Sequence, residues 1–172
     1  KASDLVFLDE SGCNTDMTRR YAYSLGGSGS VDSVPLSKPK NTTILSSIQL
    51  DGTLHYTTFS GGTTVEKFKQ YLKTDLLPHL NGDSVLVMDN MKSHHAKAVK
   101  NLLDSSGVRY IYLPPYSPDL NPIEKLWSKV KAFLRKFKAR TLDALPNAIQ
   151  RAFQTVSSSD CSGWFKYCDY LH

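Results

Sequence analysis

Two short stretches of the chain are apolar at every position, and an aspartate follows each of them directly. Residues 5–8 read LVFL before Asp9, and residues 85–88 read VLVM before Asp89. An unbroken apolar run of this length is typical of a strand that is buried on both faces of a sheet. We therefore expect these two strands to form the centre of a sheet.

Three other segments have the composition or the alternation of strands. Residues 42–50 and 53–59 flank Asp51-Gly52, a pair that favours a tight hairpin between two strands. Residues 108–113 alternate in character and predict a further strand. A weak candidate for a short strand lies at residues 20–25, before a loop-like stretch rich in Gly, Ser and Pro.

Helical periodicity marks the segments between and after these strands. The sequence TTVE from Thr63 matches a capping box, and the apolar positions after it recur at helical spacing. Ser93 is expected to cap a second helix that stops near Gly107. A third helix is expected to begin with Asn121 as its N-cap and Pro122 at its first position.

These elements predict an α/β fold with a mixed five-stranded sheet that is flanked by helices. A last helix is expected over about residues 141–156, and the length of 172 residues suits one domain with a single core. If the two all-apolar strands are parallel neighbours, their carboxyl ends meet at one edge, where the sites of open α/β sheets gather. Asp9 and Asp89 would then lie close together.

Positive charge is concentrated in residues 121–140. The whole chain has a formal net charge of +5, whereas this segment has seven basic residues and one acid, which gives 7 − 1 = +6. The basic residues are Lys125, Lys129, Lys131, Arg135, Lys136, Lys138 and Arg140. Such a helix face is either simply solvated or lies along the phosphates of a nucleic acid. The chain has no apolar run of roughly 18 residues, so no membrane partner is expected.

The one acid of that segment, Glu124, has two interpretations. It would suit a capping box with Asn121, and its charge suits the N-terminus of a helix. Alternatively, the proline-rich loop before it returns it to the sheet edge where the two aspartates are expected. Three converging carboxylates either raise a pKa or hold cations, and hard oxygen ligands suit Mg²⁺ or Mn²⁺. Two such ions could support an in-line displacement at a phosphodiester.

Three motifs surround these acids: FLDES at Asp9, VMDN at Asp89 and PPYSPDLNPIEKLW at Glu124, with 34 residues between the second and third acids. Together they resemble the mariner-like superfamily of DDE transposases, most of all its bacterial insertion-sequence branch. The resemblance implies a ribonuclease H-like fold, strand cleavage at transposon ends and strand transfer into target DNA. It also implies that the three acids are catalytic and bind Mg²⁺ or Mn²⁺, with two ions in the site.

The same resemblance implies partners and a compartment. Double-stranded DNA is the expected partner, both as transposon ends and as target, with a homodimer in the synaptic complex. A bacterial host would place the protein in the cytoplasm with the chromosome, and a eukaryotic host would place it in the nucleus. Such transposases carry N-terminal helix-turn-helix modules, so residues 1–172 are expected to be the catalytic domain without that region.

Five polar residues are expected to contact DNA. Lys125 and Lys129 belong to the basic helix, while Asn90, Lys92 and His94 follow the second apolar strand. For Asn90 and His94 the alternative is that they cap a helix. Lys125 and Lys129 could instead form an exposed face.

Four further residues are expected either to have another role or to be weaker candidates for DNA contact. Trp127 lies on the apolar stripe of its helix and is expected in the core, with base stacking as the alternative. Glu10 could reach the metals, but it is expected to face away from the site. Lys38 and Lys40 are weaker candidates for DNA contact.

Three other classes of protein stay open. A phospho-acceptor receiver domain also places acids after strands, although the Asp51-Gly52 hairpin and the proline-led basic helix argue against it. A non-catalytic DNA-binding remnant and a ribonuclease H-type hydrolase would both keep the three acids. Residues 20–27 match the corresponding segment of the family poorly, which leaves DNA contact by this loop and the activity of this copy open.

Overall fold

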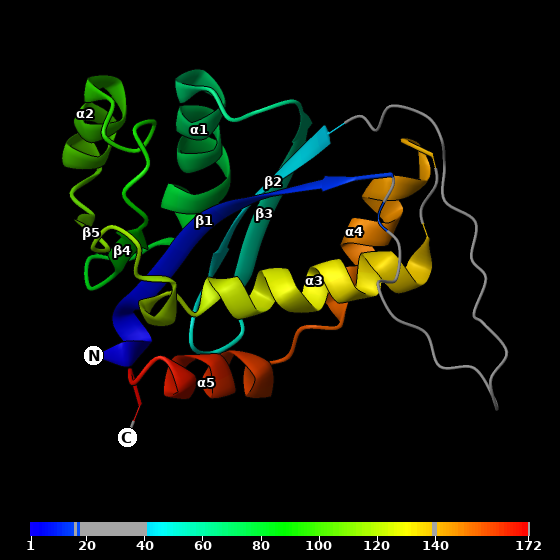
Figure 1. Cartoon of the computed structure of the whole chain (residues 1–172). Helices are drawn as coiled ribbons and strands as arrows, with labels where there is room; N and C mark the ends of the chain where they lie inside the picture. Colours follow the sequence, from blue (N-terminus) through cyan, green and yellow to red (C-terminus); the bar gives the residue numbers. More distant parts are fainter. Residues whose placement is uncertain (16, 18–40, 139–140, 172) are drawn as a thin grey trace, which may run out of the picture.

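The computed structural model describes residues 1–15, 17, 41–138 and 141–171 (Figure 1). The expected strand at residues 20–25 lies outside the described residues, as do Lys38, Lys40 and Arg140. Among the helices that are described, none combines the length and the apolar character needed to cross a bilayer.

The described residues form one mixed sheet in the order β3-β2-β1-β4-β5. β1 pairs with β4 and β4 with β5 in parallel, whereas β2 runs antiparallel to both β1 and β3. This arrangement confirms the mixed five-stranded sheet, and it excludes a receiver domain, whose sheet is parallel. The strands are β1 (Leu5–Asn14), β2 (Asn41–Ile48), β3 (Leu54–Ser60), β4 (Val85–Met88) and β5 (Arg109–Tyr112).

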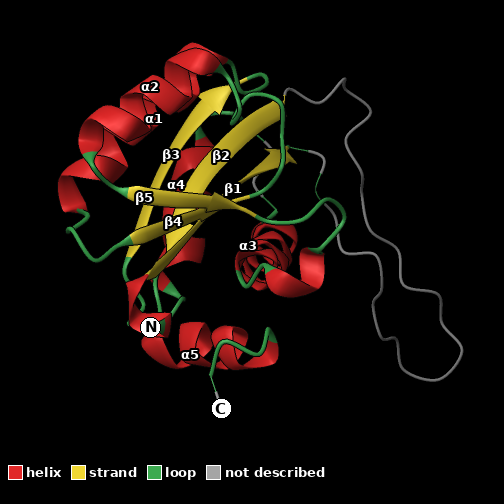
Figure 2. Cartoon of the chain, turned by 90° about the vertical axis from the view of Figure 1, so that its left-hand side faces the viewer, coloured by secondary structure: helices red, strands yellow, loops and turns green. Residues whose placement is uncertain are grey.

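Helices cover both faces of the sheet (Figures 1 and 2). On one face lie α1 (Val65–Tyr71), which continues as a π-helical turn (Leu72–Leu76) and a 3₁₀ turn (Leu77–His79), and α2 (Lys97–Ser106). On the other face lie α3 (Ile123–Phe137), α4 (Ala144–Gln154) and α5 (Ser158–Tyr167). Short 3₁₀ turns precede β1 (Ala2–Asp4) and α3 (Pro118–Leu120).

The central strand β1 contributes to two separate hydrophobic cores because its side chains alternate between faces. Val6 and Leu8 pack with α1 and α2, whereas Phe7 packs with α3, α4 and α5. All three side chains are buried. The two cores therefore meet at the central strands, as the all-apolar sequence of residues 5–8 predicts.

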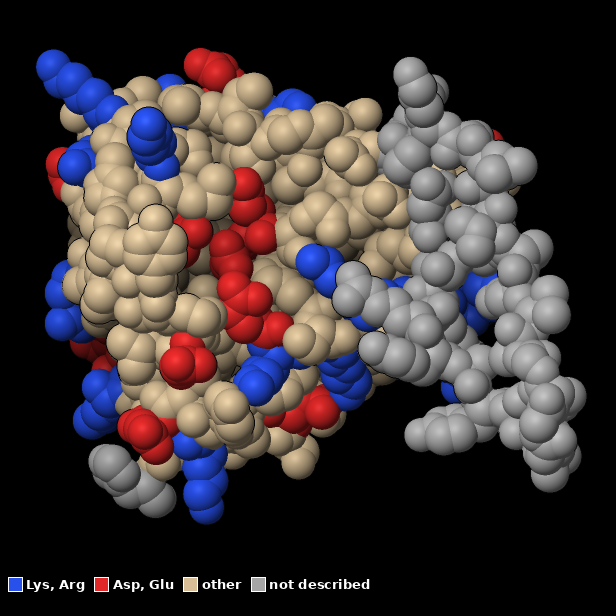
Figure 3. Space-filling view, in the orientation of Figure 1, with Lys and Arg blue, Asp and Glu red and all other residues tan. Residues whose placement is uncertain are grey.

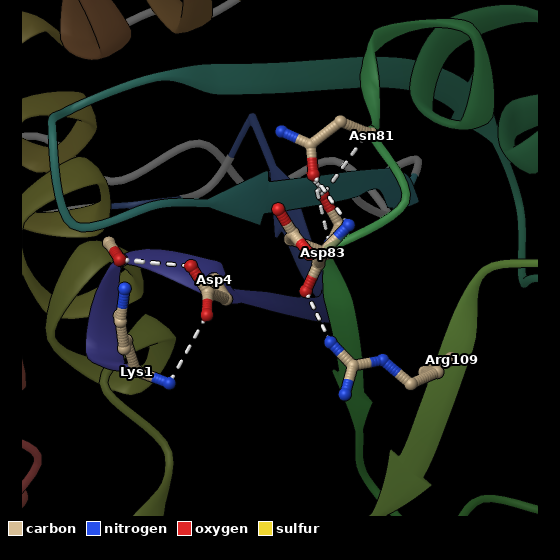
Figure 4. Close-up of polar contacts among 7 residues, drawn as sticks. Lys1, Asp4, Asn81, Asp83 and Arg109 are labelled. Atoms are coloured by element: carbon tan, nitrogen blue, oxygen red, sulfur yellow. Dashed lines mark hydrogen bonds and ion pairs between the residues drawn. The ribbon is translucent and has the colours of Figure 1, made fainter.

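Polar contacts fasten the sheet at the end where the parallel strands begin (Figure 4). Arg109, the first residue of β5, donates a hydrogen bond from Nη2 to the backbone oxygen of Asp83, just before β4, at 2.7 Å. Asn81 Oδ1 accepts from the backbone nitrogen of Asp83 at 2.9 Å. The N-terminal amine of Lys1 lies 3.2 Å from Asp4 Oδ2 before β1. These contacts lie away from the opposite edge of the sheet, where the parallel strands end.

The hairpin between β2 and β3 is confirmed and has an additional role. Gly52 has a φ of 94°, a conformation that glycine adopts without strain. The backbone nitrogen of Thr53 donates to Asp51 Oδ1 at 2.8 Å. A Cβ atom at residue 52 would lie 3.0 Å from the backbone of Ser158, so the glycine also allows α5 to approach the turn.

Two predicted helix starts are wrong. Thr64, not Thr63, is the N-cap of α1, and its hydroxyl oxygen accepts from the backbone nitrogen of Lys67 at 3.3 Å. Ser93 does not cap α2, which begins at Lys97 after a series of turns. The predicted end of α2 is confirmed, since Gly107 is its C-cap in the left-handed conformation.

The predictions for the last helices also need correction. Asn121 does not cap α3, because Pro122 is the N-cap and no side chain accepts a capping hydrogen bond there. The expected helix at residues 141–156 is α4, with Pro146 in its first turn, where a missing N–H is tolerated. The additional helix α5 was not predicted.

Candidate active site

Asp9 and Asp89 occupy equivalent positions on neighbouring parallel strands. The parallel pairing of β1 with β4 extends to Leu8 and Met88, and each aspartate is the next residue. This register confirms that the two acids meet at the carboxyl edge of the sheet. The predicted end of β1 at Asp9 is wrong, however, since β1 pairs with β2 as far as Asn14 and Asp9 lies within it.

The proline-rich loop at residues 113–122 brings the start of α3 back to this edge. At one end, the backbone nitrogen of Leu113 donates to the backbone oxygen of Met88 at 2.8 Å. At the other end, the hydroxyl of Tyr170 donates to the backbone oxygen of Leu120 at 2.8 Å. Both ends of the loop are therefore fixed, and Glu124 follows in the first turn of α3.

Asp9, Asp89 and Glu124 line one pocket of about 560 Å³. Most of the remaining lining comes from the proline-rich loop. A space-filling view shows acidic side chains gathered near the middle of one face, with Lys and Arg side chains around them (Figure 3). The structure thus brings the three predicted acids to a single site.

Asp9 is the most deeply placed of these acids, with 6% of its surface exposed. The indole nitrogen of Trp127 donates to Asp9 Oδ2 at 3.0 Å, and the backbone nitrogen of Glu10 donates to Oδ1 at 2.7 Å. Burial raises the pKa of the Asp9 carboxyl to about 7. The negative charges of Asp89 and Glu124 add to this rise in pKa, and the two hydrogen bonds oppose it.

Asp89 is held from the other face of the sheet. His94 Nδ1 lies 2.7 Å from Asp89 Oδ1, and the backbone nitrogen of Met91 donates to the same oxygen at 3.2 Å. The imidazole of His94 is fully buried and stacks on Phe68 of α1, with 4.4 Å between the ring centroids. His94 was expected to contact DNA, but a side chain with no exposed surface cannot do so. Its position instead suits orientation of the Asp89 carboxylate.

The other residues after β4 differ in their accessibility. Asn90 and Lys92 are exposed, as a DNA contact requires. Asn90 Oδ1 makes a short contact with His95 Nε2, and His95 in turn stacks on Tyr112 with 4.0 Å between ring centroids. Asn90 is therefore already oriented by aromatic neighbours.

The two lysines nearest Glu124 contact α5. Lys129 Nζ lies 2.6 Å from Asp160 Oδ2, and Lys125 Nζ lies 3.7 Å from the ring centroid of Tyr167. Lys129 was expected to bind phosphate, but it is engaged in an ion pair within the fold. Lys125 is half-buried and its cation–π contact is with an exposed ring.

The acids do not form a ready-made metal centre. Among the described residues, no three His, Cys, Asp or Glu side chains lie close enough together to hold one ion. The pocket nevertheless offers oxygen atoms of the type that Mg²⁺ and Mn²⁺ bind.

Three other residues of the site were missed or misjudged from the sequence. Trp127 is in the core as predicted, but it also binds Asp9; a buried indole N–H needs a hydrogen-bond partner, and that requirement could have revealed it. Glu10 was expected to face away, yet it lines the pocket. Asn121 also lines the pocket, whereas the sequence had predicted only a capping role for it.

The fold and this site define an α/β domain with an acidic pocket at the carboxyl edge of its sheet. The chain belongs to the DDE superfamily endonucleases, because the model of that family matches residues 4–146. The match includes all three acids of the pocket.

Relatives and solved structures agree with this family. The chain is 28% identical over 92 residues to the transposase of transposable element Tc1 from Caenorhabditis elegans, which covers 54% of this chain and 34% of the relative. It resembles the Mos1 transposase in a paired-end complex with the left transposon end, with a TM-score of 0.79, 17% identity, and coverage of 96% of this chain and 52% of that one. A Mos1 mariner paired-end complex with Mn gives a TM-score of 0.76, 19% identity, and coverage of 99% and 54%.

These similarities confirm the ribonuclease H-like fold that the sequence motifs implied. The chain spans about a third of the length of the Tc1 transposase and about half of the length of the Mos1 transposase. The bacterial insertion-sequence branch stays a prediction, since the Tc1 relative comes from a nematode.

Proposed function

We propose that the chain is the catalytic domain of a cut-and-paste transposase, which cleaves DNA strands at transposon ends and joins them to a target. One observation carries the proposal: Asp9, Asp89 and Glu124, distant in the sequence, line a single pocket. The family match and the likeness to transposases support it.

The pocket suits divalent cations bound by its three carboxylates. Mutual repulsion of these groups contributes to the raised pKa of Asp9, and a cation would relieve that repulsion. When bound, Mg²⁺ or Mn²⁺ would lower the pKa of the attacking water or 3′-hydroxyl and neutralise charge that develops at the scissile phosphate. Two ions are the expected number. One of the Mos1 paired-end complexes is a complex with Mn, which agrees with this choice of metal.

Two of the three acids, Asp9 and Asp89, each have a supporting residue with a defined task. Trp127 fixes one oxygen of Asp9 from α3, and His94 fixes one oxygen of Asp89 from the opposite core. These contacts orient the carboxylates before substrate arrives, which reduces the reorganisation needed during reaction.

DNA would approach over the exposed residues around the pocket. The exposed Asn90 and Lys92 and the half-buried Lys125 are the proposed contacts to the backbone of double-stranded DNA. Lys129 would contribute only if its ion pair with Asp160 opened. A homodimer in the synaptic complex is the expected assembly. The protein would act where the host DNA lies, in the bacterial cytoplasm or in a eukaryotic nucleus.

The decisive experiment is nicking of supercoiled plasmid DNA with Mn²⁺ by the wild-type chain and by Asp89→Asn. The variant should lose roughly 10³-fold in rate or more, because metal-ion stabilisation of the transition state is worth several kcal/mol. Its DNA affinity should stay near that of the wild type. That affinity should fall with salt, with a slope of about −0.9 per phosphate neutralised.

Asp119→Asn is the matched control, because Asp119 lies in the loop before α3 and does not line the pocket. It should nick plasmid at the wild-type rate. Equal nicking by Asp89→Asn and the wild type would remove Asp89 from the chemistry. Selective cleavage of an RNA–DNA hybrid would instead favour a ribonuclease H-type hydrolase, and no cleavage by the wild type would favour an inactive remnant.

A further inference from the structure

Asn121 ends the proline-rich loop and is 5% exposed. It lines the acidic pocket together with Glu124, which lies one helical turn further along the chain. The backbone oxygen of Asn121 accepts a hydrogen bond from the backbone nitrogen of Glu124 at 3.1 Å. Its side chain makes no such contact: within the described residues, Oδ1 is buried without a hydrogen-bond partner.

A buried amide without a partner destabilises a fold, because it has lost its hydrogen bonds to water. The usual reason for Asn before a helix is capping, and the side chain of Asn121 does not cap α3. Asn90 offers a contrast in the same pocket, since it is exposed and its Oδ1 contacts His95. The side-chain oxygen of Asn121 therefore serves no interaction of the described fold, and a partner from outside the chain would explain it.

The chemistry of the pocket identifies the kind of partner. Divalent cations accept amide oxygens of Asn as ligands beside carboxylates. A neutral oxygen raises the number of ligands without adding to the repulsion among three acids. This matters here because no three acidic, His or Cys side chains of the described residues converge on one point.

We propose that the side-chain oxygen of Asn121 is a neutral ligand of the divalent-cation site, alongside carboxylates of the same pocket. The assignment rests on the proposed function, in that it assumes a cation in this pocket. It adds a residue that the acidic motifs do not include.

The test is calorimetric titration of Mn²⁺ into the metal-free chain, combined with thermal unfolding in EDTA. Asn121→Ala should weaken Mn²⁺ binding by roughly 10-fold or more, while the unfolding temperature of the metal-free protein stays equal or rises. Asn121→Asp should restore Mn²⁺ affinity, because it returns an oxygen ligand. Its metal-free form should unfold at a lower temperature, because it adds a carboxylate to the pocket.

Two further variants separate the possible failures. Asn147→Ala is the matched control and should bind Mn²⁺ like the wild type, because Asn147 is exposed on α4 and does not line the pocket. Asp9→Asn should lose most of the affinity. If Asp9→Asn weakens binding and Asn121→Ala does not, the assignment of Asn121 is wrong and the cation site stands. The assignment is also wrong if Asn121→Asp fails to restore affinity. If Asp9→Asn binds Mn²⁺ like the wild type, the cation site itself, and with it the proposed function, is wrong.

Discussion

The two aspartates of the pocket come from adjacent strands but are supported from opposite faces of the sheet. Asp9 is buried and accepts a hydrogen bond from Trp127, which belongs to the core under α3, α4 and α5. The side chain of Asp89 is 33% exposed and contacts His94, which stacks on Phe68 in the core under α1 and α2. Each hydrophobic core thus fixes one acid, and the pocket depends on both.

The difference in burial has an energetic consequence. Burial raises the pKa of Asp9 to about 7, so near neutral pH its carboxyl is partly protonated in the absence of a cation. Binding of a cation at Asp9 is then coupled to release of a proton. Three predictions probe how differently the two regions work.

The largest effect is expected from Trp127→Phe, which keeps an aromatic ring in the core and removes the N–H that binds Asp9. Loss of a residue that orients a ligand should reduce Mn²⁺-dependent nicking by roughly 10- to 100-fold. The measurement is the initial rate of plasmid nicking at saturating Mn²⁺. Trp164→Phe makes the same chemical change in a tryptophan of α5 and should have little effect on the rate. Equal losses in both variants would mean that packing, rather than the hydrogen bond, matters.

A smaller loss is expected on the Asp89 side from His94→Phe. The new ring can still stack on Phe68, so the fold is kept, but the donor to Asp89 is lost. Because the backbone nitrogen of Met91 also donates to this carboxylate, we expect a loss of about 10-fold in nicking rate. His79→Phe is the control, since it keeps the stack on His55 and lies outside the pocket. An unchanged rate in His94→Phe would mean that the backbone nitrogen of Met91 orients Asp89 without help from His94.

The third prediction concerns stability rather than rate. The unfolded chain releases the Asp9 proton at about pH 3.9, whereas the folded chain keeps it until about pH 7. The wild-type free energy of unfolding should therefore fall as pH rises across this window, by on the order of a few kcal/mol. Asp9→Asn should lack this contribution, so that it becomes the more stable protein at neutral pH.

Urea unfolding between pH 5 and 8 in EDTA would measure this effect of Asp9. The difference between wild type and Asp9→Asn should widen up to about pH 7 and then stay constant. Parallel curves across the whole range would mean that the carboxyl of Asp9 is not destabilised in the fold.

The centre of the fold could be predicted from the sequence because the information there is local. The apolar runs before Asp9 and Asp89 can only be buried on both faces, and Asp51-Gly52 specifies its own turn. The helix α5 was missed for the opposite reason. Its stretch contains Ser158, Gly163 and few apolar residues, and it is held by distant contacts such as Lys129 with Asp160.

The site was predictable in its acids and not in their supports. The resemblance and the order of the strands placed the carboxylates, and the structure brings them to one pocket. The tasks of Trp127 and His94 could not be read from the chain, because they depend on which side chains each ring meets across the fold. Asn121 was misjudged since a cap is its usual local use, and only the structure reveals that its oxygen is unused.

Tyr170 gives the last part of the described chain an influence on the pocket. Its hydroxyl binds Leu120 in the loop before Glu124, and its ring contacts Phe7 of β1, with 5.0 Å between the ring centroids. The segment after α5 is therefore connected to the wall of the pocket through one hydrogen bond and one aromatic contact. Tyr170 thus makes the shape of the pocket depend on how this segment is placed.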